Sequence, residues 1–446
     1  MSSFLFLAAF AALPFIGFPF LRVSRTVPPS RAACVATSAA WGGVAICAEM
    51  LLLTFLRVRW TLPLLLAAPA VCVAVGRRRR AGPPAPKAEN GAPSLFACSA
   101  AALVLVAVTY AAGTARATSA DLMLFWASKG QKFAQARAID IAFLGAPEHR
   151  LMHTDYPPLL PCLYAFATMI AGRFAWGASL LTLPIFLGIA GLAFFGLARS
   201  SLGGRVAGEL TVVLLALCGF VLVVTGCAGN ADPPLVAFEV LALSALVFAR
   251  DRGYGLAAMG IALSAAVLTK VEGTVFAALV LGVALVLAGR GARRRVLRTA
   301  GVPPALALLA WVVFTRAHGL ADVYGFQSGS RLSFAHLPLV LKETGRSAAY
   351  GAWYAPWIAV AALLIGCRSG ARSLAPLAVG FGFTGFILYL YLSAAADPTL
   401  FIVWSASRLL VTPLICFFVA AAASTSRASP TMGGGASFRK PEGLGT

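Results

Sequence analysis

The stretch VAGELTVVLLALCGFVLVVT (206–225) carries one charged residue and is otherwise apolar or small. A helix needs about 20 mainly apolar residues to cross a bilayer, and runs of this kind recur along the whole chain. Of the 446 residues, 60% are hydrophobic and 11% are charged, whereas a soluble globular protein has about 25% charged residues. A membrane β-barrel would show short segments of alternating hydrophobicity instead. The sequence therefore predicts an all-α protein, a polytopic transmembrane helical bundle.

The net charge of +21 comes mostly from arginines in short loops between apolar runs, such as RSSLGGR (199–205), RRRR (77–80) and RGARRRVLR (290–298). Short basic loops are typical of the cytoplasmic side of membrane proteins. This pattern accounts for the charge without nucleic acid. The predicted partner is the lipid bilayer, and no nucleic acid is expected.

Applying the same rule along the chain predicts about 13 spans, with the N-terminus outside and the C-terminus inside. The segment 158–172 has only about 15 residues, short for a span, and a crossing there would put the basic loops on inconsistent sides. We therefore assign it as a re-entrant or interfacial helix. The predicted spans are 2–21, 32–56, 60–76, 94–115, 176–198, 206–225, 233–249, 254–269, 274–289, 299–316, 351–366, 374–393 and 408–425.

This topology suggests three parts. Residues 1–93 form an N-terminal three-span addition and a cytoplasmic linker, residues 94–425 form the main transmembrane module, and residues 426–446 form a disordered Gly/Ser-rich tail. Residues 116–157 are the longest polar stretch. They are predicted to be the first large outer loop and to carry juxtamembrane helices.

Ionisable residues collect on the predicted outer side, and at membrane depth such residues are expensive and mark function by default. In DLMLFWASKGQKFAQA (121–136), Asp121, Phe125 and Lys129 would share one face of a helix. The alternative is an amphipathic anchor on the bilayer surface, with Asp121 as its N-cap.

Two further aspartates precede prolines and an apolar run. They are Asp155 in HTDYPPLLP (153–161) and Asp232 in GNADPPL (229–235). Each is predicted to be a helix cap or a site residue. In TKVEG (269–273), Lys270 and Glu272 would pair with each other, reach to the interface or join the site.

Arg408, in WSASRLL (404–410), is predicted to open the last span. A cation there suits a lipid phosphate.

His149 and His153 are four residues apart beside Glu148. This spacing would suit a divalent metal if the segment were helical, although the nearby prolines disfavour a helix. The metal question stays open, and no cofactor is predicted with certainty.

The motifs in order are an acid after an early span, W-x-x-K, H-x-D-Y-P-P-L-x-P, A-D-P-P-L, T-K-x-E-G and S-x-R-L-L. This series resembles the GT-C glycosyltransferases. The closest group is the bacterial branch of protein mannosyltransferase-like, aminoarabinose transferase-like and rhizobial lipopolysaccharide glycosyltransferase-like proteins. The resemblance covers roughly residues 94–425 and is not specific for a substrate.

The resemblance implies an integral membrane enzyme, in a bacterial inner membrane, that transfers a sugar from a polyprenyl-phosphate donor to a lipid, glycan or protein acceptor on the extracytoplasmic face. It implies that Asp121 is the general base or orients the acceptor, and that Asp232 and Asp155 are further catalytic acids. Lys129, Lys270 and Arg408 would hold the donor phosphate, because a leaving phosphate needs cations rather than an acid catalyst. The substrate-binding residues expected in all are Trp126, Lys129, His153, Tyr156, Lys270, Glu272 and Arg408.

Two departures concern the acceptor. The lipopolysaccharide-type relatives often carry a soluble domain after the last span, and the three N-terminal spans are not part of the common module.

The competing functions are a transporter or flippase of lipid-linked sugars and a non-catalytic membrane subunit. A transporter would show inverted repeats with polar residues near the midplane, whereas here the ionisable residues collect on one side.

Overall fold

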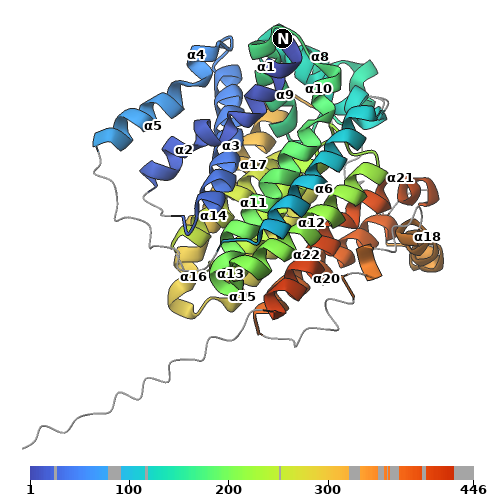
Figure 1. Ribbon diagram of the computed structural model, residues 1–446. Helices are drawn as coiled ribbons and strands as arrows, with labels where there is room; N and C mark the ends of the chain where they lie inside the picture. Colours follow the sequence, from blue (N-terminus) through green and yellow to red (C-terminus); the bar gives the residue numbers. More distant parts are fainter. Residues whose placement is uncertain are drawn as a thin grey trace, which may run out of the picture.

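The computed structural model describes residues 1–24, 28–78, 92–115, 119–250, 253–320, 332–349, 356–358, 360–361, 371–393 and 398–425. These residues form helices and no strands, which confirms the all-α prediction. Figure 1 shows a bundle of long helices with shorter ones at its ends.

Eight helical segments of the described residues are long and apolar enough to cross a membrane: Ser2–Val23, Arg31–Phe55, Leu95–Thr114, Trp176–Leu202, Gly204–Val224, Arg290–Ala317, Ser373–Leu392 and Thr399–Ser424. Three shorter apolar helices accompany them, Leu159–Ala171, Gly253–Thr269 and Val271–Leu287. The polytopic helical class is therefore observed. The finer prediction of about 13 spans stays a prediction, since 351–366 lies largely outside the described residues.

The bundle is built from α1 (Ser2–Ala11), α2 (Leu13–Val23), α3 (Arg31–Phe55), α4 (Leu62–Leu65), α5 (Ala67–Arg78), α6 (Leu95–Thr114), η1 (Asp121–Ala127), α7 (Ser128–Ala136), α8 (Ile141–Gly145), η2 (Pro147–Met152), α9 (Leu159–Ala171), α10 (Trp176–Leu180), α11 (Thr182–Leu202), α12 (Gly204–Val224), α13 (Asp232–Phe248), α14 (Gly253–Thr269), α15 (Val271–Leu287), α16 (Arg290–Val296), η3 (Leu297–Gly301), α17 (Val302–Ala317), η4 (Phe334–His336), α18 (Leu337–Ala349), α20 (Ala371–Leu392), α21 (Thr399–Leu409) and α22 (Val411–Ser424).

The predicted span 60–76 is not one continuous helix. It is divided at Leu66 into α4 and α5. Pro69 has no N–H to donate to the Leu65 carbonyl, so the helical hydrogen-bond ladder is interrupted here.

The last helical segment begins earlier than predicted. Residues 399–407, expected to be outer loop, belong to α21, and Arg408 lies within the segment Thr399–Ser424 instead of opening it. Pro413 interrupts the ladder between α21 and α22, because it cannot donate to the Leu409 carbonyl. Apolarity alone would not place a cation inside a span, which is why the sequence prediction started the span at Arg408.

The N-terminal helices pack against the rest of the bundle. The Ser30 hydroxyl donates to the Gly196 carbonyl at 3.0 Å, and the hydroxyls of Thr37 and Tyr254 lie 2.5 Å apart. Phe6 stacks on Tyr164 of α9 with a ring distance of 6.0 Å. These contacts tie the segment predicted as an N-terminal addition to α9, α11 and α14.

Consecutive long helices alternate in direction, so loops separated by two helices lie at the same end. Figure 1 places α8, α9 and α10 at one end of the bundle and the arginine-rich α16 at the other. The connections before α13 and before α15 lie at the first end. This alternation brings together residues that are more than a hundred positions apart.

Candidate active site

The segment 121–136 is helical, as predicted, but its first part has an unexpected geometry. Residues Asp121–Ala127 form a π-helix that continues into α7. Single π turns are rare and are frequent at functional sites. Trp126 and Phe133 are almost fully buried, and a Cβ on Gly130 would lie 2.4 Å from the Tyr164 Cβ. The segment therefore packs tightly on α9, unlike a free surface anchor.

Asp121 forms an ion pair with Arg408. The Arg408 Nη1 donates to the Asp121 Oδ2, and the two side chains are 21% and 22% exposed respectively. The pair joins the start of η1 to α21, 287 positions along the chain. The pair is therefore screened from most of the solvent but not completely buried.

A second set of charged residues is buried from solvent. Lys270, between α14 and α15, contacts the Asp232 Oδ1 at 3.0 Å and the Glu272 Oε1 at 3.4 Å. The Lys270 side chain is only 3% exposed. Of the alternatives left open for this motif, Lys270 reaching to the interface is wrong, because burial and two carboxylates hold its ammonium group inside.

None of the three aspartates caps a helix. The N-cap positions of η1, α9 and α13 are Ala120, Pro158 and Ala231. The capping interpretation of Asp121, Asp155 and Asp232 is therefore wrong. Asp121 and Asp232 instead form ion pairs with cations from distant segments of the chain.

The HTDYPP segment is held on both sides. The Lys129 Nζ donates to the His153 carbonyl, and the Trp311 Nε1 donates to the Asp155 carbonyl at 2.8 Å. The aromatic rings around it are packed together. The His153 ring stacks on Tyr156 at 4.3 Å and contacts Phe125 at 4.7 Å, while Trp126 lies 5.8 Å from Tyr156.

The electrostatics of this segment show how close the two charge sets are. Burial and then the cations Lys129, Lys270 and Arg408 lower the pKa of His153 to about 4. Burial lowers the pKa of Lys129 to about 7, although Asp155 opposes this shift. Burial raises the pKa of Tyr156, with Glu272 adding to the effect. The imidazole is thus neutral at pH 7, and all ten predicted site residues belong to one neighbourhood.

The predicted metal spacing does not produce a metal-binding cluster in the described residues. Residues 147–152 form a 3₁₀ helix that ends at His153 in the left-handed region (φ 49°). His149 packs on Phe143, 4.2 Å away, and its Nδ1 contacts the Phe143 carbonyl at 2.7 Å. The two histidines therefore face different neighbours.

Glu239 is a buried acidic residue that the sequence prediction did not single out. It is fully buried on α13, two turns beyond Asp232, and both of its carboxylate oxygens accept hydrogen bonds from Thr412, at 2.8 and 3.0 Å. The signal in the sequence was a single acid within the apolar run 233–249. An acidic residue within a membrane-spanning segment is expensive and is a candidate functional residue by default.

Residues 155–317 match the family model described as Dolichyl-phosphate-mannose-protein mannosyltransferase. The matched region contains Asp155, Asp232, Lys270 and Glu272, whereas Asp121 and Arg408 lie outside it. No curated protein and no solved structure matches the chain. The match confirms the predicted resemblance to membrane glycosyltransferases.

Proposed function

We propose that the chain is a membrane glycosyltransferase that uses polyprenyl-phosphate-linked sugars, because residues 155–317 match the dolichyl-phosphate-mannose-protein mannosyltransferase family, and that Asp121 and Arg408 form its reaction centre. The observation that carries this proposal is their ion pair. It puts a carboxylate able to accept a proton beside a cation able to hold a phosphate.

Arg408 is the best-placed cation for the donor phosphate. Its Nε is buried and has no hydrogen-bond partner among the described residues, and a buried donor without a partner is costly. A guanidinium presents a planar fork that matches a phosphate. Lys270, by contrast, is already occupied by two carboxylates.

Donor binding would then activate the base. When the phosphate takes the Arg408 guanidinium, Asp121 loses its cation and becomes available to the acceptor hydroxyl. The hydroxyl oxygen forms a bond to the anomeric carbon, the bond from that carbon to the phosphate oxygen breaks, and the proton passes to the Asp121 carboxylate. The electron pair leaves with the lipid phosphate, which Arg408 stabilises.

The other charged groups position this centre. Asp232 and Glu272 hold the buried Lys270 ammonium group in place. Lys129 fixes the His153 carbonyl and hence the aromatic group of Phe125, Trp126, His153 and Tyr156. Asp155 would orient the acceptor.

We place the reaction on the extracytoplasmic side. The arginine-rich helix α16 lies at the end of the bundle away from α8 and α10 (Figure 1). Basic loops face the cytoplasm, so the end with the charged site would face outward. The acceptor would be a lipid, a glycan or a protein that carries a hydroxyl group.

The test is sugar transfer in membranes that express the wild type, Asp121→Asn or Asp140→Asn, fed with a panel of radiolabelled polyprenyl-phosphate sugars. Asp140 is the matched control, because it only caps α8 through a 2.9 Å bond from the Phe143 N–H, and asparagine caps equally well. General base catalysis contributes about 10²–10⁴-fold. Transfer should fall by about that factor in Asp121→Asn at equal protein level and remain unchanged in Asp140→Asn.

Equal transfer by the wild type and Asp121→Asn would remove Asp121 as the base. Transfer lost in both variants would point to a general disturbance of the outer segment. Product formed only from donor supplied to the cytoplasmic side of sealed vesicles would overturn the proposed orientation.

A further inference from the structure

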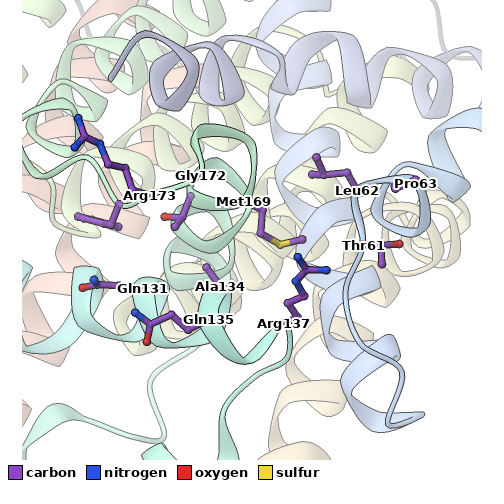
Figure 2. Close-up of a pocket in the computed structure, with 12 residues that line it drawn as sticks. Thr61, Leu62, Pro63, Gln131, Ala134, Gln135, Arg137, Met169, Gly172 and Arg173 are labelled. Atoms are coloured by element: carbon purple, nitrogen blue, oxygen red, sulfur yellow. The ribbon is translucent and has the colours of Figure 1, made fainter. Parts of the chain in front are cut away.

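A cavity of about 560 Å³ lies on the side of α7 away from the charged site. Figure 2 shows it between α7, the end of α9 and the segment that begins α4. Lys129 and Phe133 of α7 are buried in the bundle, whereas Gln131 and Gln135 line the cavity. One short helix thus separates two polar regions.

Six of the twelve residues that line the cavity are polar or cationic, and the other six are apolar or glycine. The lining contains no acidic residue, and its polar members are Thr61, Gln131, Gln135, Arg137, Thr168 and Arg173. Neither arginine forms an ion pair with an acid in the described part of the chain. Arg173 donates from its Nε to the Ser2 hydroxyl at 2.8 Å, which leaves its other donors available.

Arg137 occupies a position that favours glycine. It ends α7 in the left-handed region, at φ 51° and ψ 38°. Glycine is the residue normally found at such a helix end. The conformation is held from the N-terminal segment, because the Trp60 N–H donates to the Arg137 carbonyl at 2.7 Å and the Ile139 N–H donates to Thr54 at 3.1 Å. A costly backbone fixed in this way suggests that the side chain is needed.

Thr168 provides an independent observation. It is 8% exposed and lines the cavity, and its hydroxyl has no hydrogen-bond partner among the described residues. Several other helical threonines bond to the carbonyl four residues earlier, as Thr211 and Thr269 do at 2.7 and 2.6 Å. A buried hydroxyl without a partner is costly, and a ligand in the cavity would satisfy it.

We propose that this cavity binds a phosphorylated polyol. Two arginines suit a phosphate, while the glutamine amides and threonine hydroxyls suit hydroxyl groups. The volume lies within the range of about 300–1,000 Å³ that is typical of small-molecule sites. Sugar phosphates and the glycerophosphate headgroup of a lipid share this chemistry. The site is separate from the proposed reaction centre and does not depend on it.

The test is calorimetric titration of the purified full-length protein in neutral detergent with glucose 6-phosphate and, for comparison, glucose. The variants are Arg137→Gly, Thr168→Val and the control Arg59→Ala, an exposed arginine that does not line the cavity. Glycine relieves the left-handed backbone, so Arg137→Gly should keep or raise the thermal midpoint while it removes the guanidinium.

We expect glucose 6-phosphate to bind at least about tenfold more tightly than glucose, and its affinity to fall about tenfold or more in Arg137→Gly, since a hydrogen bond to a charged group is worth about that factor. Thr168→Val should weaken binding less, and Arg59→Ala not at all. Three outcomes would overturn the proposal. They are equal affinity for both sugars, no binding of glucose 6-phosphate, and full affinity for glucose 6-phosphate in a folded Arg137→Gly protein.

Two further arms distinguish the sources of the ligand. The same titration is repeated with the protein in nanodiscs of phosphatidylglycerol or of phosphatidylcholine. A headgroup occupant would make phosphatidylglycerol, but not phosphatidylcholine, compete with glucose 6-phosphate. Equal affinity in both would assign the site to a soluble or glycan-borne sugar phosphate.

Discussion

The two charge sets of the site differ in how closed they are. Lys270 is 3% exposed and is held by Asp232 and Glu272, whereas Arg408 and Asp121 are each about one fifth exposed and bind mainly each other. A buried charge that loses its partner is strongly destabilising, while a partly exposed one is compensated by water. From this difference we expect the first set to stabilise the bundle and the second set to separate when a substrate binds.

The substitution Lys270→Met should have the largest effect on stability. The change leaves two buried carboxylates without their cation, so the free energy of unfolding should fall by about 3–5 kcal/mol. Thermal unfolding in detergent measures it. Lys132→Met is the matched control, since Lys132 is exposed and should change stability by less than about 0.5 kcal/mol. A Lys270→Met protein as stable as the wild type would mean that the closed set is not structural.

Arg408→Lys tests the open set. Lysine keeps the charge but loses the planar fork, so kcat/KM for the lipid-linked donor should fall about 10- to 100-fold, with the thermal midpoint nearly unchanged. Donor titrations in solubilised membranes measure this, with Arg316→Lys, an exposed arginine at the end of α17, as the control. Unchanged donor kinetics would separate Arg408 from phosphate binding.

The third prediction concerns Lys129, which is buried and donates to the His153 carbonyl. Its pKa is lowered to about 7 by burial, against about 10.4 in an unfolded chain. Between these values the unfolded chain binds a proton that the folded protein does not hold. The wild type should therefore gain stability with rising pH relative to Lys129→Met, by about 1.4 kcal/mol per pH unit above pH 7.

Thermal midpoints of the wild type and Lys129→Met, measured between pH 6 and pH 9 in detergent, check this sign. The advantage of Lys129→Met at pH 6 should shrink as the pH rises. A constant difference would mean that the Lys129 ammonium group keeps its proton throughout.

The candidate site could be predicted from the sequence because its residues stand out from an apolar background. An aspartate or lysine in a membrane protein must have a reason, so Asp121, Asp155, Asp232 and Lys270 were visible without a structure. The pairing of Lys270 with Glu272 was one of the predicted alternatives, and the structure contains it, but the partners from distant segments were not predicted. Arg408 was predicted to hold phosphate, and nothing in the sequence indicated that it pairs with Asp121.

Apolar composition by itself determined the helical membrane fold, since a bilayer leaves the backbone few other ways to satisfy its hydrogen bonds. It did not determine where helices break, because Pro69 and Pro413 act through single missing bonds. Only the tertiary structure decided which charges meet, how deeply Lys270 is buried and that Arg137 faces a cavity. The physical reason is that these features depend on contacts between helices, whereas hydropathy is a property of each segment alone.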